Sequence, residues 1–193
     1  SRALEELRRC FFFLLLLRRR AMGSLQKDEE LALLDGPQGL LKVAQKYLDR
    51  KEYDDGLRVA KDALELAQDI EDDEAKEAAL LEVVRIYLLH DDTDGALEAV
   101  REAVEKYEED EDAPGRAFAM QQQASLLVKK GDTAEAAQVA QQAAQVCDEN
   151  DDAKGKASAL GALAKARAAA GDAEEAVKAA LEWLGAPQDA GGK

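Results

Sequence analysis

The sequence has 193 residues, of which 47% are hydrophobic and 35% are charged, and alanine supplies much of the apolar fraction. The formal net charge of −15 repels phosphate backbones, so nucleic acid is excluded from the expected partners. Strong helix formers dominate, proline occurs only three times, and no run of β-branched and aromatic residues predicts a strand. We therefore expect an all-α protein.

Residues 1–24 stand apart from the rest of the chain in charge and composition. They hold six Arg and two Glu and so carry +4, which leaves −19 on the remainder (−15 minus +4). The apolar run at 10–17 is far shorter than the ~20 residues of a membrane span, and Arg18–Arg20 occupy the place where a signal peptide has small residues. Three interpretations stay open for this non-globular segment: translated sequence upstream of Met22, a cloning scar, or an organelle-targeting or membrane-surface segment.

Residues 25–37 predict a short N-terminal capping helix. The stretch LQKDEELALLD at 25–35 suits a helix, and Gly36-Pro37 breaks it. At the other end, Trp183 is expected to fill the space beyond the last repeat, and the polar tail at 188–193 is expected to be disordered.

Between these ends, residues 38–187 repeat every 40 residues without a gap. Residues of similar size recur in the same columns, among them Leu40, Leu80, Met120 and Leu160, and Ala60, Val100, Ala140 and Ala180. The period divides this part of the chain into four units at 38–75, 76–115, 116–155 and 156–187.

Each unit predicts two helices joined by a tight turn. In the first unit, apolar residues at helical spacing predict helices over 38–50 and 54–70. In later units Gly131-Asp132 and Gly171-Asp172 pair a helix-ending Gly with a polar residue suited to the turn. One such unit cannot bury both of its apolar stripes, so neighbouring units must stack into a solenoid.

The spacing of small and aromatic residues over 38–187 resembles that of the tetratricopeptide repeat (TPR) family, in a 40-residue form similar to the repeats of kinesin light chains and Pins-type scaffolds. The matching positions hold a small residue and then an aromatic in the first helix, and a small residue in the second: Ala44, Val84, Ala124 and Ala164; Tyr47 and Tyr87; Gly56, Ala96, Ala136 and Ala176. The chain departs from the family where Gln68, Glu108 and Asp148 replace its usual Pro, and where Leu127 and Arg167 replace the aromatic. The resemblance implies a right-handed α-solenoid of four helix-turn-helix repeats.

The resemblance also implies a concave groove, lined by the first helix of each repeat, that holds an extended peptide or a helix. Carried onto this sequence, the groove residues are Leu41, Gln45, Leu81, Arg85, Phe118, Gln121, Gln122, Ser125 and Lys165. This surface is apolar and rich in amides, with Arg85 and Lys165 as isolated positive charges. The Lys, Asn and Arg residues with which chaperone-binding members clamp a carboxylate are replaced here by Leu41, Gln45, Glu82, Phe118 and Gln122, so that function is not expected.

The expected function is therefore a protein–protein interaction adaptor or scaffold that binds a peptide or helix in this groove. The alternative is a structural subunit of a larger multiprotein assembly, bound through its edges and convex face.

Residues that carry catalytic or metal chemistry are scarce. His90 is the only histidine, and we expect it to be exposed. No nucleophile–base pair or phosphate-binding loop is present, so no enzyme activity, metal, cofactor or small-molecule substrate is expected. The two cysteines, Cys10 and Cys147, form no disulfide framework, and they favour the cytoplasm or another reducing intracellular compartment.

Overall fold

A computed structural model describes residues 27–185 of the chain. Its helices are α2 (Lys27–Leu34), α3 (Pro37–Asp49), α4 (Tyr53–Asp69), α5 (Asp73–Leu89), α6 (Thr93–Glu109), α7 (Ala113–Lys130), α8 (Thr133–Glu149), α9 (Ala153–Ala169) and α10 (Ala173–Gly185). The all-α prediction is confirmed, because these residues contain no strand. The predictions for residues 1–24, for the tail at 188–193 and for the side chain of Trp183 lie outside what the structure describes.

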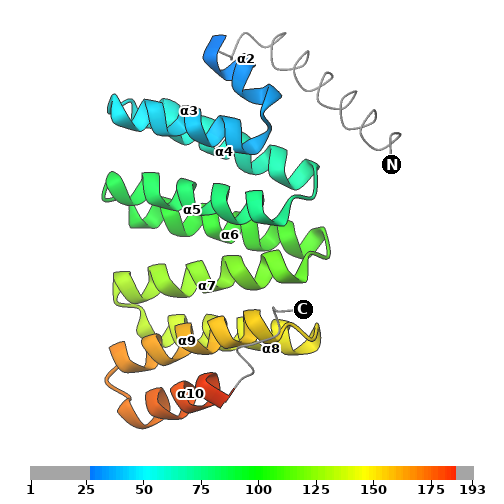
Figure 1. Ribbon diagram of the computed structural model, residues 1–193. Coiled ribbons are helices and arrows are strands. Elements are labelled where there is room, and N and C mark those ends of the chain that lie inside the picture. The colour runs from blue at the N-terminus through cyan, green and yellow to red at the C-terminus, as the bar shows by residue number, and fades with distance from the viewer. Residues whose placement is uncertain (1–26, 186–193) are drawn as a thin grey trace. The chain divides into compact units, whose positions relative to one another are not determined.

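The chain divides into two compact units between Ile86 and Tyr87. In the first unit α2 packs on α3 and α3 on α4; in the second, α6, α7, α8, α9 and α10 pack in succession, and α7 also contacts α9 (Figure 1). The columns expected to be apolar lie in the core, where Leu40, Leu80, Ala60 and Ala140 are at most 1% exposed. Small side chains in these columns let the helix backbones approach closely.

The turns from α3 to α10 all close in the same way. The second residue after each helix end, or the first after α7, has a positive φ between 56° and 98°. These residues recur every 20 positions: Lys51, Glu71, Asp91, Glu111, Gly131, Asp151 and Gly171. The next residue then donates its backbone N–H to the carbonyl oxygen five positions earlier, for example Asp112 to Tyr107 at 2.9 Å. This bond satisfies a carbonyl that the helix end would otherwise leave without a partner. The helix and its turn therefore form a 20-residue building block, half of the 40-residue sequence period.

Aspartate begins several of these helices. The side chains of Asp92, Asp112 and Asp152 accept a hydrogen bond from the N–H three residues later, at 2.8 to 2.9 Å. An N-terminal carboxylate of this kind satisfies a free backbone donor and interacts favourably with the helix dipole.

Glycine at the positive-φ positions is expected to stabilise the protein, because a side chain is strained there. Glu111 has φ 57° and an exposed side chain, so we expect Glu111→Gly to raise the free energy of unfolding by about 0.5–1 kcal/mol. The matched reverse change, Gly131→Ala at φ 98°, should lower it by about 1 kcal/mol. Urea denaturation followed by circular dichroism measures both, and a loss of stability in Glu111→Gly would contradict this account of the turns.

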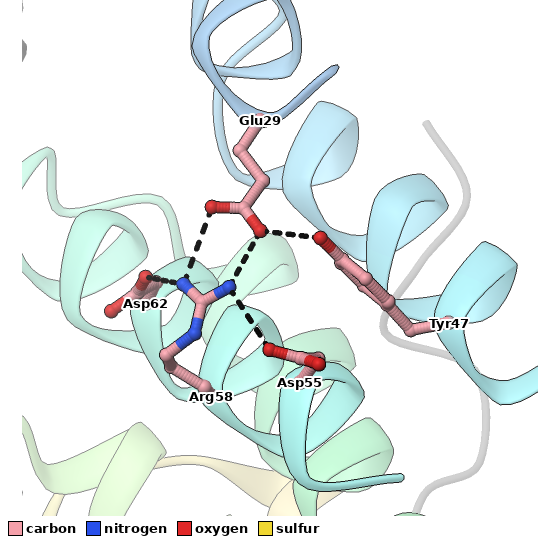
Figure 2. A network of polar contacts seen from close by, with 5 residues as sticks. All are labelled: Glu29, Tyr47, Asp55, Arg58 and Asp62. Atoms are coloured by element: carbon pink, nitrogen blue, oxygen red, sulfur yellow. Dashed lines mark hydrogen bonds and ion pairs between the residues drawn. The ribbon is translucent and has the colours of Figure 1, made fainter. Parts of the chain in front are cut away.

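Helix α2 is fastened to the first repeat by a polar network (Figure 2). The Glu29 carboxylate is fully buried; it accepts a hydrogen bond from the Tyr47 hydroxyl at 2.8 Å and two from the Arg58 guanidinium at 2.6 and 3.3 Å. Arg58 also pairs with Asp55 at 3.7 Å and Asp62 at 3.6 Å. The predicted capping helix therefore holds its place through a buried charge whose partners come from both α3 and α4.

Tyr47 gives this network a signature at alkaline pH. Burial, and then the hydrogen bond to the Glu29 carboxylate, raise the pKa of Tyr47 from 10.0 to about 12. The folded state thus favours the protonated phenol, and this stabilisation is fully present below pH 10 and lost as the pH rises through 12. We expect Tyr47→Phe to lose less stability than the parent between these two pH values. Tyrosinate absorbance should in addition show a component titrating near 12 in the parent that Tyr47→Phe lacks.

The core of the second unit holds the thiol of Cys147. Cys147 is 2% exposed. Burial, which is the larger cause, and the negative charge of Asp152, which is the smaller one, together raise the pKa of the thiol from 9.0 to about 11. Because the thiolate is the reactive species, Cys147 in a Cys10→Ser variant should resist iodoacetamide below pH 9 in the folded protein and react readily in urea. Equal rates in the two conditions would show that the thiol is accessible.

Candidate functional site

The predicted groove residues of the first unit lie on α3 and α5. Leu41 and Gln45 are partly exposed, and Leu81 is 44% exposed. The Arg85 guanidinium donates a hydrogen bond at 3.0 Å to the side-chain oxygen of Gln45, the residue 40 positions earlier. The register predicted from the repeat thus places α3 and α5 side by side with their candidate residues in contact.

Arg85 is not the isolated positive charge that the sequence suggested. Its guanidinium forms an ion pair with Glu82, one turn earlier on α5, at 3.1 Å. Gln45 has a second bond of its own, from its amide nitrogen to Asp49 at 2.9 Å. Glu82 could have been recognised from the sequence, because it stands three residues before Arg85 and such pairs meet on a helix. The surface of the first unit is therefore an apolar Leu81 beside a neutralised Arg85.

In the second unit, candidate residues from α7 and α9 meet around a cavity of about 470 Å³. Its lining consists of Gln121, Gln122, Ser125, Ser158, Gly161, Ala162, Ala164, Lys165 and Ala180. Four of the residues predicted for this part of the groove, Gln121, Gln122, Ser125 and Lys165, are among them. Phe118 is partly buried and does not line the cavity.

The cavity follows from the small residues of α9. Gly161 occupies the column that holds Leu41, Leu81 and Gln121 in the preceding repeats, so a large side chain is missing there. Ala162, Ala164 and Ala180 add no bulk around it. Helix packing is otherwise close to solid density, so the loss of one large side chain opens a recess.

Gln121 is a structural residue as well as a lining residue. It is 8% exposed, its amide oxygen accepts a 2.6 Å hydrogen bond from the Ser158 hydroxyl, and its amide nitrogen donates to the Gly155 carbonyl at 3.4 Å. The Gln121 side chain therefore ties α7 to α9, in addition to lining the cavity as predicted. The sequence did not suggest Ser158, although it shares a column with Phe118.

Lys165 is the cation of this cavity. It is exposed, and it has no hydrogen-bond or ion-pair partner among residues 27–185. Ser125 occupies the same column one repeat earlier. Its hydroxyl donates a hydrogen bond to the backbone carbonyl oxygen of Gln121 at 3.0 Å. The cavity thus combines apolar walls with one unneutralised ammonium group, and such a site suits an apolar group next to an anionic one.

A second cavity in this unit, of about 310 Å³, lies among α8, α9 and α10. Its cations have partners: Lys156 pairs with Asp148 at 2.5 Å, and Lys178 with Glu175 at 3.6 Å. Its charges are therefore largely neutralised within the unit.

The structure adds two observations on metals and membranes. Residues 27–185 contain no group of three or more His, Cys, Asp or Glu side chains placed to hold a metal ion, and His90 is exposed, as predicted. Within the same residues, no helix combines the length and the apolarity that crossing a bilayer requires.

Comparison with solved structures identifies the fold. No protein family profile matches the sequence, and no curated protein matches it significantly. Solved structures do match: the nearly identical TPR-like repeats of a kinesin light chain from Podospora anserina are 16% identical, with a TM-score of 0.59 over 95% of this chain and 92% of that one. The chain is also similar to BtubC from P. vanneervenii, with 17% identity and a TM-score of 0.58 over 95% and 71% of the two chains. A Rap protein crystallised with competence and sporulation factor is 16% identical, with a TM-score of 0.57 over 86% of this chain and 45% of that one.

Proposed function

Because the chain has the fold of TPR-like repeat proteins, we propose that it is a protein-interaction adaptor. It binds a peptide or a helix on the faces formed by the first helix of each repeat. These faces are α3 and α5 in the first unit and α7 and α9 in the second. The observation that carries the proposal is the 470 Å³ cavity, where three predicted groove residues lie with a fourth, Lys165, whose ammonium group has no partner among residues 27–185. The complex of Rap, a neighbour in fold, with competence and sporulation factor supports the same class of function.

The chemistry of the two faces differs. In the first unit, Leu81 offers apolar contact while Glu82 already neutralises Arg85. In the second, the Gln122 amide and the Lys165 ammonium group suit peptide backbone and an acidic group. We therefore expect ligands that place an apolar side chain, rather than an acidic one, against Leu81.

A peptide-display selection against the full chain tests the proposal. A motif should be enriched on the parent. Leu81→Glu or Lys165→Glu, according to the unit whose face the motif contacts, should bind it on the order of tenfold more weakly, because each places a repelling or desolvated charge in the contact. The matched controls are Leu34→Glu on α2, whose leucine is 69% exposed, and Lys154→Glu at the start of α9, where an acidic residue suits the helix dipole.

If the controls weaken binding as much as the face variants, or if no motif is enriched, the adaptor proposal fails. The second candidate, a structural subunit of an assembly, then stands. The observation that favours it is the exposed apolar pair Val177 and Leu181 on α10, which does not line the cavity of Lys165.

A further inference from the structure

The cavity of Lys165 lies where the fourth repeat lacks two side chains that the second repeat has. In α5, Leu81 and Glu82 are neighbours in the chain, and the Glu82 carboxylate pairs with the Arg85 guanidinium at 3.1 Å. The same three columns are occupied in α9 by Gly161, Ala162 and Lys165. The fourth repeat therefore keeps the cation of this arrangement and lacks both its apolar side chain and its acid.

The missing acid explains why Lys165 is not neutralised. Residues three apart on a helix are neighbours, and this is how Glu82 reaches Arg85. Ala162 stands three residues before Lys165 and has no group that could pair with it, and Lys165 has no hydrogen-bond or ion-pair partner among residues 27–185. The other residues that line the cavity carry no charge, although the chain has 41 acidic residues. The ammonium group is thus open to a carboxylate that another molecule supplies.

The missing leucine explains the space beside Lys165. Gly161 has no side chain where α5 has Leu81, and the walls around it are small: Ala162, Ala164 and Ala180. The resulting volume of about 470 Å³ lies within the range of about 300–1,000 Å³ that ligand pockets occupy. A bulky apolar side chain that enters this space leaves water and gains contact with the alanine walls.

We infer that the cavity binds a peptide segment in which a large apolar residue stands within four positions of an Asp or Glu. Such a ligand supplies the two side chains that the fourth repeat lacks: the apolar one fills the space beside Gly161, and the carboxylate accepts a hydrogen bond from Lys165. An interval of up to four positions covers both an extended peptide and one turn of a helix. The inference rests on the proposed adaptor function and adds to it the class of ligand that the second unit binds.

Peptides from the display selection provide the probes. Those that bind the full chain but not Lys165→Glu should share the apolar and acidic pair. Each is then synthesised with an acetylated N-terminus and an amidated C-terminus, so that no terminal carboxylate can replace the acidic side chain. Titration calorimetry should show binding about tenfold weaker when the Asp or Glu is changed to its amide, and again when the apolar residue is changed to alanine.

Substitutions in α9 test the same pair from the side of the protein. Ala162→Glu restores the acid three residues before Lys165 and should weaken binding of these peptides about tenfold, whereas Ala162→Gln adds the same bulk without charge and should weaken it clearly less. Gly161→Leu restores the leucine that this column holds in α3 and α5, and by filling the cavity it should also weaken binding about tenfold. Lys154→Glu, on α9 but outside the lining, should bind as the parent does.

The inference is overturned if the peptides lost on Lys165→Glu bind equally well without their acid or their apolar residue. It is also overturned if Ala162→Glu weakens binding no more than Ala162→Gln, or if a folded Gly161→Leu binds as the parent does. Far-ultraviolet circular dichroism checks the folding of each variant, and the Ala162 pair decides alone if Gly161→Leu fails to fold. Peptides that depend only on Leu81 would overturn this inference and leave the adaptor proposal standing, whereas both fail if no peptide is enriched.

Discussion

Glu29→Ala is expected to lower the free energy of unfolding by about 2–4 kcal/mol. The change leaves the Tyr47 hydroxyl buried without its acceptor and removes both hydrogen bonds that the Arg58 guanidinium makes to α2. The loss stays below that of a wholly buried pair, because Arg58 is 34% exposed and keeps Asp55 and Asp62 as partners. Urea denaturation measures the loss, and hydrogen exchange should show the amides of α2 opening first.

A double-mutant cycle identifies the interaction itself. If Glu29 and Arg58 act as a pair, Glu29→Ala/Arg58→Ala should lose clearly less stability than the sum of the two single losses. Additive losses would mean that α2 is held by its apolar contacts and that the network of Figure 2 contributes little. Glu29→Gln keeps the shape and one acceptor, and should fall between the parent and Glu29→Ala.

The second large effect is expected for Gly39→Ala, at about 1–3 kcal/mol of lost stability. Gly39 lies in α3 where α2 ends, and a Cβ atom there would overlap the backbone carbonyl oxygen of Ala32. The other three repeats have Ala79, Ala119 and Ala159 in this column, so alanine suits the position wherever α2 is not beside it. Because a backbone atom blocks the methyl group, α2 must shift, and this cost outweighs the ~1 kcal/mol by which alanine favours a helix.

Gly56→Ala is the matched control for this prediction. Its added Cβ would meet the Leu48 side chain at 3.3 Å and the Ala44 carbonyl oxygen at 3.5 Å, close to ordinary contact. Gly56→Ala should therefore be neutral or stabilising in the same urea titration. If Gly39→Ala proves as stable as the parent, α2 does not pack on α3 as described.

The helices and their register followed from the sequence because a single period governs both. Helices predicted over 38–50 and 54–70 lie at Pro37–Asp49 and Tyr53–Asp69, and the small column Ala60, Ala140 is buried as expected. Periodicity is a local signal that four repeats reinforce, so chance deviations in any one repeat matter little.

The polar network and the cavity were harder to predict, because each depends on one residue that breaks the pattern. Glu29 stands in an acidic stretch, KDEELA, in which nothing marks it as buried, and its partner Arg58 is 29 residues away. Gln121 is a residue type usually found at the surface, yet its side-chain amide is hydrogen-bonded to Ser158 and Gly155. Gly161, by contrast, could have been recognised, since its column holds leucine in the first two repeats.

The uniform turns also explain how a chain of this fold can carry so much negative charge. Each turn is closed by backbone groups and one left-handed residue, so its side chains are free to vary. Glu71, Asp91, Glu111 and Asp151 all sit at these left-handed positions with their side chains in water. Part of the acidity of the protein is thus a property of its turns. Exchanging these four carboxylates for lysines would change the net charge by +8, from −15 to −7, and raise the isoelectric point while leaving the packing of the described helices intact.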